Sequence, residues 1–462
     1  MLPKGTRDFL PADMARREYV IDTISQVFKV FGYKRIETPA IELNKTLSGK
    51  YGEEGDRLMF KVMPRGEKLE AMAQKNTNEL KALVEEALRY DLTVPFARFV
   101  VDHRNELTFP FKRFQIQSVW RADRPQKGRY REFTQCDADV VGIAGMVQEA
   151  ELLHIYDQSF GALRLPVQIR LNHRGLLQAL AESLGAGENL IGFTTALDKL
   201  DKVGWGGVAE EWQKLGLTIN ADSLKLAQEV LTERLPFTEG ILRIESLLGH
   251  LEPAKDALMS LKELEFLLFS SPLRHAELVF DLSLARGLDY YTACIFEVAA
   301  LGIEMGSIGG GGRYDNLTGV FGLKDTPGVG ISFGIDRIEL AMQQLELFSN
   351  ELIKGPDILF AHMGKGIEAA LKLANRLRQL GIITEVYPTE ARLKKQIEFA
   401  AKTGIRFLAI LGEEELAKGE LVLKDLEKGL QLNLNQEDWL EKLEKGDKSL
   451  EKSFSFALGG QI

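Results

Sequence analysis

A cluster of basic residues between two apolar stretches is the part of this sequence best suited to chemistry. Arg121, Arg124, Lys127, Arg129 and Arg131 all lie between residues 121 and 131. Because several guanidinium groups cannot be buried cheaply without partners, we expect them at the exposed tip of a hairpin. Arginine offers a fixed fork of N–H donors that matches phosphate oxygens. The segment therefore favours a phosphate-binding loop, with a solvated charged turn as the alternative.

Three further segments carry residues suited to binding a ligand. Segment 286–292 combines an arginine, an acid and two tyrosines, whose hydroxyls can donate and accept hydrogen bonds, although tyrosines that cap a core would look the same. The glycine run 309–312 would weaken an ordinary strand, so it indicates either a ligand against bare backbone or a flexible turn. Arg337 follows an apolar stretch and enters a predicted helix, where a salt bridge is the usual role. The spacing of glycines in 328–334 fits neither a Walker loop nor a dinucleotide-binding fingerprint.

The composition excludes several classes of protein. With 462 residues, 45% hydrophobic and 27% charged, the chain is too long for one core and has an ordinary globular composition. A net charge of −9 argues against indiscriminate nucleic-acid binding but leaves room for a local basic surface. Cys136 and Cys294 are too few for a disulfide framework or a cysteine-based zinc site. Since no apolar run could span a bilayer and the N-terminus lacks a signal-peptide core, we expect a cytoplasmic protein without membrane contact.

The elements that must position these residues can be read from the apolar pattern. Phe114–Val119 and Phe133–Val141 have the length to pair as antiparallel strands on either side of the basic loop. Helical patterns dominate residues 174–271, whereas strands and helices alternate after Gly355, which is typical of a small α/β domain with a largely parallel sheet. Further expectations are a loop or hairpin over Leu47–Arg65, a helix over Lys75–Arg89, and strands over Val167–Asn172, Glu277–Ser283, Tyr290–Val298 and Glu304–Gly310.

Together these segments resemble the histidyl-tRNA synthetases, which are class II aminoacyl-tRNA synthetases, and the resemblance covers nearly the whole chain. Arg286–Thr292 and Gly310–Asp315 resemble the two histidine-specific signatures of that family, which are far more specific than the general class II motifs. Arg121–Phe133 is similar to the second class II motif and Gly330–Arg337 to the third. The start of the chain, from Lys4 to Pro39, resembles the family's beginning and its dimer-forming first motif.

The resemblance implies the fold and its division into domains. The expected fold is an α+β class II catalytic domain, an antiparallel sheet flanked by helices, with a helical insertion and a C-terminal α/β anticodon-binding domain. The expected bounds are 1–173 and 273–350 for the two parts of the catalytic domain, 174–272 for the insertion, and 356–462 for the anticodon-binding domain.

The resemblance also implies an activity. Histidine and ATP would form histidyl-adenylate and pyrophosphate, and histidine would then pass to the 3′-terminal ribose of tRNA(His). Arg121 and Arg286 are the implied catalytic residues, holding the α-phosphate from two sides. The implied partners are histidine, ATP with Mg²⁺, tRNA(His) and a second copy of the chain, with no protein-bound metal. The implied ATP site is Arg121, Asp123, Arg129, Arg337, Gly310 and Gly311; the histidine site is Asp91, Thr93, Gln135, Asp139, Arg286, Tyr290 and Tyr291; Lys127 and Arg129 would meet the tRNA acceptor end.

Three alternatives remain open at this point. A synthetase-like regulatory subunit of ATP phosphoribosyltransferase tends to lose the Arg286 signature and the C-terminal domain, and both are present here. A synthetase-like sensor of uncharged tRNA should lack Arg121, Arg286 or Arg337, and all three are present. Another class II synthetase is disfavoured by the run Arg-Gly-Leu-Asp-Tyr-Tyr at residues 286–291.

Overall fold

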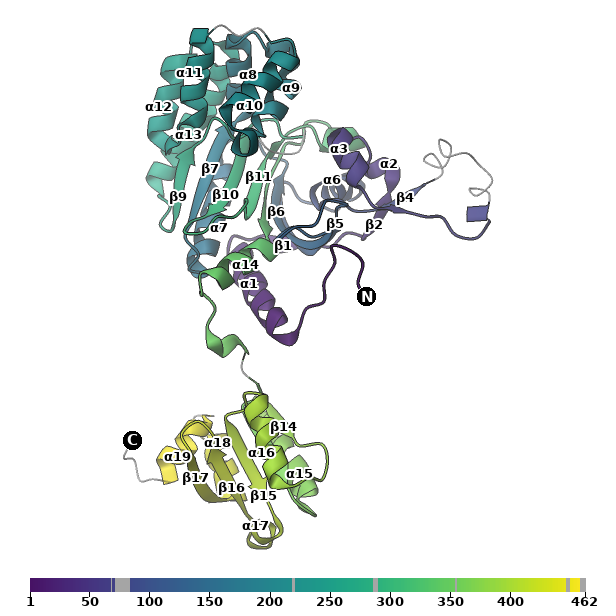
Figure 1. Ribbon diagram of the computed structural model, residues 1–462, viewed down its shortest axis with the longest axis vertical. Helices are drawn as coiled ribbons and strands as arrows, with labels where there is room; N and C mark the ends of the chain where they lie inside the picture. The colour runs from purple at the N-terminus through teal and green to yellow at the C-terminus, as the bar shows by residue number, and fades with distance from the viewer. Residues whose placement is uncertain are drawn as a thin grey trace. The chain divides into compact units, whose positions relative to one another are not determined.

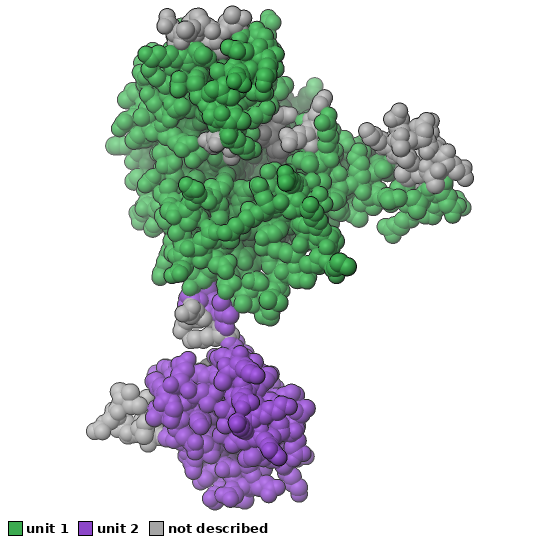
Figure 2. Space-filling view, viewed as in Figure 1, with its two compact units in different colours: residues 1–348 green, residues 349–462 purple. Residues whose placement is uncertain are grey.

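The computed structural model describes residues 1–67, 69–70, 84–217, 221–285, 290–353, 355–445 and 449–457. The chain divides into two compact units, residues 1–348 and 349–462, and each is described by itself (Figures 1 and 2). Within the described ranges, no helix is both long and apolar enough to cross a membrane.

A nine-stranded sheet forms the centre of the first unit. The pairs β1–β5 and β7–β9 are parallel, and the remaining neighbours are antiparallel. In sheet order the strands are β1 (Lys34–Arg35), β5 (Phe111–Trp120), β6 (Glu132–Val141), β12 (Gly328–Gly334), β11 (Gly309–Tyr314), β10 (Cys294–Ala300), β7 (Val167–His173), β9 (Ala276–Phe280) and β8 (Leu235–Pro236).

The hairpin predicted around the basic loop is confirmed. Strands β5 and β6 pair antiparallel along their whole length, with Val119 opposite Phe133 near the loop. Gln126 and Arg129 bridge across the tip, so the basic residues lie on a closed turn rather than an open coil.

Helices cover one face of the central strands of this sheet. Helix α1 (Pro11–Val30) packs on α7 (Val147–Ala162) and α14 (Ile335–Gln344), α7 and α14 pack on β12, and α14 also packs on β6. Aromatic rings fill the space between, with Phe333 of β12 at 4.8 Å from Tyr156 and 5.8 Å from Phe28 between ring centroids. Because successive strand residues point to opposite faces, the residues beside these core positions face away from the helices.

The predicted predominance of helices between residues 174 and 271 is confirmed. These helices gather beyond β7 and β9 (teal in Figure 1), and the described strand among them is the two-residue β8. They are α8 (Arg174–Ser183), α9 (Leu190–Leu197), α10 (Leu200–Lys214), α11 (Ala221–Thr232), α12 (Phe237–Leu248) and α13 (Glu252–Ser270).

Some local predictions are wrong. The prediction of a helix over Lys75–Arg89 is wrong at its C-terminal end, where the structure has a strand, β4 (Glu86–Leu88). This strand pairs on one side with β2 (Ile41–Leu43) and on the other with β3 (Lys61–Val62). Residues 75–83 of that prediction lie outside the described residues. The segment Leu47–Arg65, expected as a loop or hairpin, contains a helix, α3 (Gly52–Leu58), as well as strand β3. The strand expected over Glu304–Gly310 begins only at Gly309. Tertiary pairing decides such short segments, because their intrinsic propensities differ little.

The second unit has the predicted α/β character. Strand β13 (Ile358–His362) pairs parallel with β14 (Thr384–Val386) and β15 (Phe407–Leu411), and β16 (Glu420–Asp425) and β17 (Leu430–Asn435) extend the sheet antiparallel. The sheet order is β14-β13-β15-β16-β17, with helices α15 (Gly366–Gln379), α16 (Leu393–Lys402), α17 (Glu413–Lys418), α18 (Gln436–Lys445) and α19 (Leu450–Ala457).

Candidate active site

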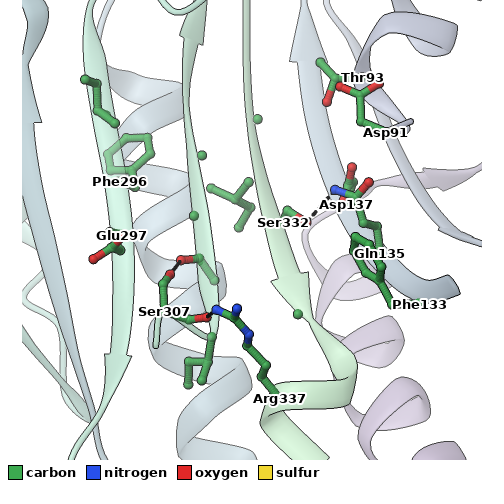
Figure 3. Close-up of a pocket in the computed structure, with 18 of the residues that line it drawn as sticks. Asp91, Thr93, Phe133, Gln135, Asp137, Phe296, Glu297, Ser307, Ser332 and Arg337 are labelled. Carbon is green, nitrogen blue, oxygen red and sulfur yellow. Dashed lines mark hydrogen bonds between the residues drawn. The ribbon is translucent and has the colours of Figure 1, made fainter. Parts of the chain in front are cut away.

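A cavity of about 500 Å³ lies on the face of the large sheet opposite helices α1, α7 and α14. Strand β6 sends Phe133, Gln135, Asp137 and Asp139 into it, because residues two apart share a face. Antiparallel register places Ser332 of β12 opposite Asp137 (Figure 3). The site is therefore built on central strands, which hold side chains more rigidly than loops do.

The structure brings most of the predicted site residues together. Of those it describes, Lys127 is the one that does not line the cavity; it lies at the hairpin tip. Arg286 lies outside the described residues, which break at 286–289. The predicted residues that line the cavity are Asp91, Thr93, Arg121, Asp123, Arg129, Gln135, Asp139, Tyr290, Tyr291, Gly310, Gly311 and Arg337.

Arg121 is held at the wall of the cavity by the backbone and the rings of its neighbours. Its Nε donates to the carbonyl of Tyr90 at 3.0 Å. Its guanidinium carbon stands 4.4 Å from the centre of the Tyr90 ring and 5.2 Å from that of Phe133. Stacking of this kind orients a guanidinium without neutralising it. The positive charge is thus available to an anionic ligand.

Two further arginines line the cavity, and each joins separate segments of the chain. Arg337 of α14 donates to the carbonyls of Ser307 at 2.6 Å and Gly128 at 3.2 Å, which fixes the hairpin tip beside β11. Arg129 donates to Asp123 at 2.8 Å across the base of the same tip. Figure 3 shows Arg337 and Ser307 at the opposite end of the site from Asp91 and Thr93.

Asp91 lies at that opposite end and already has protein partners. It is 1% exposed and accepts hydrogen bonds from the hydroxyls of Tyr51 at 2.8 Å and Tyr290 at 3.2 Å, and from the backbone N–H of Val94. Burial raises the pKa of Asp91, whereas these hydrogen bonds and the charge of Arg121 lower it. The carboxylate thus anchors the start of α6 (Thr93–Asp102) to the two tyrosines.

Asp139 is paired with two residues that the sequence reasoning missed. Arg113 of β5, fully buried, lies 2.7 Å from Asp139 Oδ2, and the hydroxyl of Tyr314 donates to Asp139 Oδ1 at 2.5 Å. Burial raises the pKa of Asp139, and the guanidinium of Arg113 opposes that rise. Tyr314 stands inside the second histidine signature and could have been found there; Arg113 lies in an apolar strand pattern and carries no such signal.

Asp137 was also missed, although its spacing indicates a place in the site. Residues 135, 137 and 139 are polar and alternate with the buried apolar residues 136, 138 and 140, which marks a polar face. Burial raises the pKa of Asp137 to about 7, with Arg113 opposing and Asp139 reinforcing the rise.

The glycines of β11 serve two different purposes. Gly310 and Gly312 share the cavity face with Ser332 and Gly330 of β12, and a Cβ at Gly312 would come within 2.8 Å of the Tyr291 ring. Gly311 faces the other way, where a Cβ would lie 2.2 Å from the carbonyl oxygen of Gly330. The glycine run thus leaves the cavity floor bare on one face and lets the strands approach on the other.

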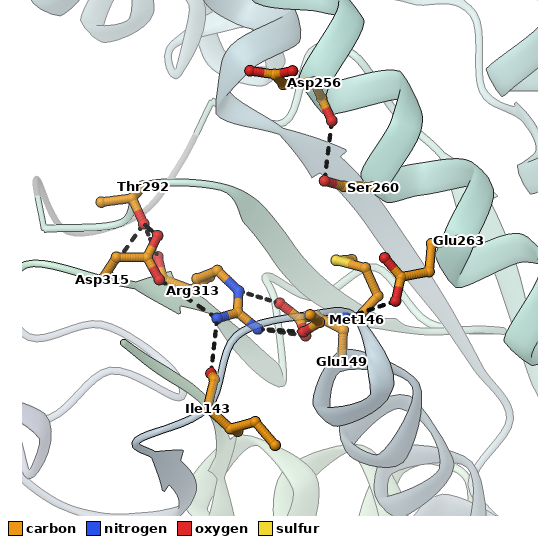
Figure 4. A network of polar contacts seen from close by, with 10 residues as sticks. Ile143, Met146, Glu149, Asp256, Ser260, Glu263, Thr292, Arg313 and Asp315 are labelled. Atoms are coloured by element: carbon orange, nitrogen blue, oxygen red, sulfur yellow. Dashed lines mark hydrogen bonds and ion pairs between the residues drawn. The ribbon is translucent and has the colours of Figure 1, made fainter. Parts of the chain in front are cut away.

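A polar network with a buried ion pair at its centre links the two signature segments (Figure 4). Arg313 of β11 makes a two-pronged ion pair with Glu149 of α7 at 2.5 and 2.8 Å. Asp315, 3.4 Å from Arg313, accepts from the hydroxyl of Thr292 at 2.6 Å. The strand that carries the glycines and the segment that carries Tyr290 and Tyr291 are therefore fixed relative to each other.

The charged and hydroxyl side chains that line the cavity are suited to phosphate and amino-acid ligands. Arg129 and Arg337 line the cavity near Asp123, whereas Arg121 lies within electrostatic reach of Asp91, which shares the opposite end with Tyr290. Across the described part of the chain, no group of three or more His, Cys, Asp or Glu side chains could hold a metal ion.

Two protein-family models match this chain. A family model described as histidyl-tRNA synthetase matches residues 5–338, and one described as anticodon binding domain matches residues 358–446. A histidine–tRNA ligase of Christiangramia forsetii is 48% identical over 94% of this chain and 97% of its own length.

Two solved structures extend the comparison to the fold. The histidyl-tRNA synthetase of Nostoc sp. PCC 7120 superimposes with a TM-score of 0.79 at 28% identity, covering 96% of this chain and 99% of its own. A Bacillus halodurans protein, titled as an ATP phosphoribosyltransferase regulatory subunit/histidyl-tRNA synthetase, gives a TM-score of 0.71 at 20% identity, covering 89% and 97%. The second likeness shows the fold alone.

Proposed function

This chain belongs to the histidyl-tRNA synthetase family, and we propose that its cavity holds ATP at the Arg337 end and histidine at the end formed by Asp91 and Asp139. The family is shown by the match over residues 5–338 and by the 48% identity to a curated histidine–tRNA ligase. The enzyme activates histidine with ATP and ligates it to tRNA; the reaction is that of the family, and the residue roles below are our proposal.

In the activation step, negative charge grows on the α-phosphoryl oxygens as the histidine carboxylate attacks and pyrophosphate leaves. Fixed cations aimed at those oxygens stabilise the transition state more than the ground state. Arg121, stacked between Tyr90 and Phe133, supplies one such cation. Arg286 is proposed to supply the second cation, because it begins the first histidine signature. Arg337, held at Ser307 and Gly128, contacts the ATP tail, with Asp123, Arg129, Gly310 and Gly311 completing the nucleotide site.

Mg²⁺ is proposed to arrive as a complex with ATP. Magnesium retains water and binds phosphate oxygens with few carboxylates, so it needs no dedicated protein cage. It screens the triphosphate charge, while the arginines position the phosphates.

Histidine is proposed to bind with its imidazole at Asp139 and Tyr291 and its α-amino group near Asp91, Thr93 and Gln135. Arg113 favours the ionised form of Asp139, which can then accept an imidazole N–H. A site with buried acceptors rejects analogues that lack the matching N–H, because its own polar groups would be left unpaired. Tyr290 contributes by fixing Asp91 through its hydroxyl.

The transfer step is proposed to use the hairpin tip and the second unit. Lys127 and Arg129 lie at the tip and would contact the acceptor end of tRNA(His). The unit that contains residues 356–462 would read the anticodon, whose unstacked bases present their edges for recognition. Residues 1–173 and 273–350 would form the catalytic domain and 174–272 the insertion. We further propose that the chain forms a homodimer through α1 and β1, which correspond to the family's first motif. We also propose that the enzyme acts in the cytoplasm.

The observation that supports these roles is that described residues of both histidine signatures and of the second and third class II motifs line one cavity. The test is ATP–pyrophosphate exchange by Arg121→Ala, with Arg104→Ala as a control that removes an exposed arginine away from the cavity. We expect a loss of about 10²–10³ in exchange rate for Arg121→Ala, as for a lost transition-state donor, and none for the control. Near-normal exchange by Arg121→Ala would remove Arg121 from the α-phosphate.

A further inference from the structure

Residues 4–9 lie against the basic hairpin, although none of them lines the cavity. The carbonyl of Gly5 accepts from the backbone N–H of Arg131 at 2.8 Å, and the carbonyl of Arg131 accepts from that of Arg121 at 2.9 Å. Gly5 has a φ of +87°, and a Cβ there would lie 2.8 Å from Arg131 Cγ and 2.9 Å from Pro125 Cγ. This segment therefore packs directly on the base of the hairpin that carries Arg121.

Within this segment, Arg7 joins the hairpin to the start of α14. Its Nη1 donates to the hydroxyl of Tyr130 at 3.2 Å, and its Nη2 makes an ion pair with Asp336. Its guanidinium carbon lies 4.0 Å from the centre of the Tyr130 ring and 4.4 Å from that of Phe9. Tyr130 and Asp336 both line the cavity. One side chain outside the cavity thus touches two residues of its wall that come from separate elements.

The surroundings of Asp336 indicate that Arg7 is not there simply to neutralise a buried carboxylate. Arg17 of α1 lies 2.9 Å from Asp336, and the backbone N–H of Thr134 donates to Asp336 Oδ2 at 3.1 Å. Without Arg7, Asp336 would keep a buried cation and a backbone donor. The hydroxyl of Tyr130, in contrast, has Arg7 as its hydrogen-bond partner among the described residues. Removal of Arg7 should therefore disturb the hairpin more than the helix.

Two side chains tie the hairpin tip to α14, and Arg7 is one of them. Arg337 donates from α14 to the carbonyl of Gly128, and Arg7 connects Tyr130 to Asp336, the residue before Arg337. A planar guanidinium is suited to such a link, because it can stack on a ring while its edge donates to a carboxylate. A tip that is held before ATP arrives does not have to be ordered when ATP binds, which favours affinity.

We propose that Arg7 is a positioning residue for ATP, which holds the hairpin tip in place by tying Tyr130 to Asp336. The inference rests on the proposed ATP site, and Arg7 itself touches no substrate. The effect should concern ATP rather than histidine. Asp336 adjoins Arg337, and Figure 3 shows Arg337 at the opposite end of the site from Asp91.

The experiment is Arg7→Ala in the full chain, with the KM for ATP and the KM for histidine measured separately by ATP–pyrophosphate exchange. We expect the KM for ATP to rise about tenfold, as for one lost hydrogen bond to a charged group, and that for histidine to stay within about twofold. An unchanged KM for ATP, or an equal rise for both substrates, would overturn the proposal.

Arg7→Lys separates the link from the charge. Lysine keeps a cation beside Asp336 but lacks the planar fork that stacks on Tyr130 while it donates at both ends. The KM for ATP should therefore remain raised in Arg7→Lys, and full recovery would overturn the link through Tyr130. This variant retains the positive charge, so it decides the question even if Arg7→Ala fails to fold.

A double-mutant cycle tests whether Arg7 acts through Tyr130. In a Tyr130→Leu background, Arg7→Ala should change the KM for ATP by less than about twofold, because the partner of Arg7 is already absent. An undiminished effect of Arg7→Ala in that background would overturn the proposal.

A matched control is Arg98→Ala. Arg98 also belongs to the first unit, is partly exposed and pairs with a buried carboxylate, Glu42, at 2.7 Å, but it does not line the cavity. Its loss should lower stability in urea unfolding and leave the KM for ATP unchanged. Normal exchange by Arg121→Ala would overturn the proposed ATP site as well as this inference. Impaired exchange by Arg121→Ala with a wild-type KM for ATP in both Arg7 variants would overturn this inference alone.

Discussion

Arg113→Met should be among the most damaging substitutions that touch no substrate. Arg113 is buried and lies 2.7 Å from Asp139, whose side chain is 3% exposed. Methionine keeps much of the volume but leaves Asp139 as an uncompensated charge. Removal of one partner of a buried ion pair typically costs about 3–5 kcal/mol, because the other charge stays desolvated. The lost hydrogen bond to the carbonyl of Leu92, at 3.2 Å, acts in the same direction.

The cost should depend on pH in a defined direction. Without the guanidinium, the pKa of Asp139 rises further above its value in the unfolded chain. A carboxyl with a raised folded pKa destabilises the protein as pH rises from about 4 through that pKa, because the unfolded chain ionises first. The loss of unfolding free energy should therefore be larger at pH 8 than at pH 5.

Urea unfolding at these two pH values measures the cost, and the double variant Arg113→Met with Asp139→Asn is the control. Removal of both charges should recover most of the lost stability, since a buried pair replaced as a unit is often nearly neutral. The double variant should still bind histidine poorly, because the amide that replaces the Asp139 carboxylate carries no charge for the imidazole. A loss below about 1 kcal/mol for Arg113→Met at pH 8, or no recovery in the double variant, would refute the reasoning.

Three further outcomes follow from the same geometry. Tyr291→Phe should raise the KM for histidine more than that for ATP in pyrophosphate exchange, and equal changes would remove its hydroxyl from the imidazole site. Gly330→Ala should weaken histidine binding by about tenfold or more, measured by calorimetry, because a Cβ there would lie 2.0 Å from Asp139 Oδ1 and overpacking costs about 1–3 kcal/mol. Deletion of residues 349–462 should spare adenylation and impair tRNA charging, since the first unit has its own core; undiminished charging of full-length tRNA would contradict the anticodon assignment.

Much of the site could be predicted because its residues lie in short signatures. The basic hairpin, the tyrosine segment 286–292 and the glycine run each carry a local pattern, and the strands around the hairpin have clear apolar runs. The polar alternation at 135, 137 and 139 was equally local, so Asp137 was within reach of the sequence.

Other features depend on contacts between distant segments. Arg113 meets Asp139 only because β5 and β6 pair in the register that places them opposite each other, and a slip of one residue would turn Arg113 to the other face. The face of each glycine in β11 is likewise set by pairing with β12. The strand β4 was predicted as helix because three residues flanked by helix-forming sequence carry too little periodicity to reveal a strand.

The most direct test of the central claim is ATP–pyrophosphate exchange by the purified enzyme with each amino acid in turn. The account predicts exchange with histidine and none with the others, because the buried carboxylates and tyrosines match both nitrogen groups of that substrate. The account would be contradicted if another amino acid supported exchange as well as histidine does. It would also be contradicted if the folded protein showed no exchange with any amino acid.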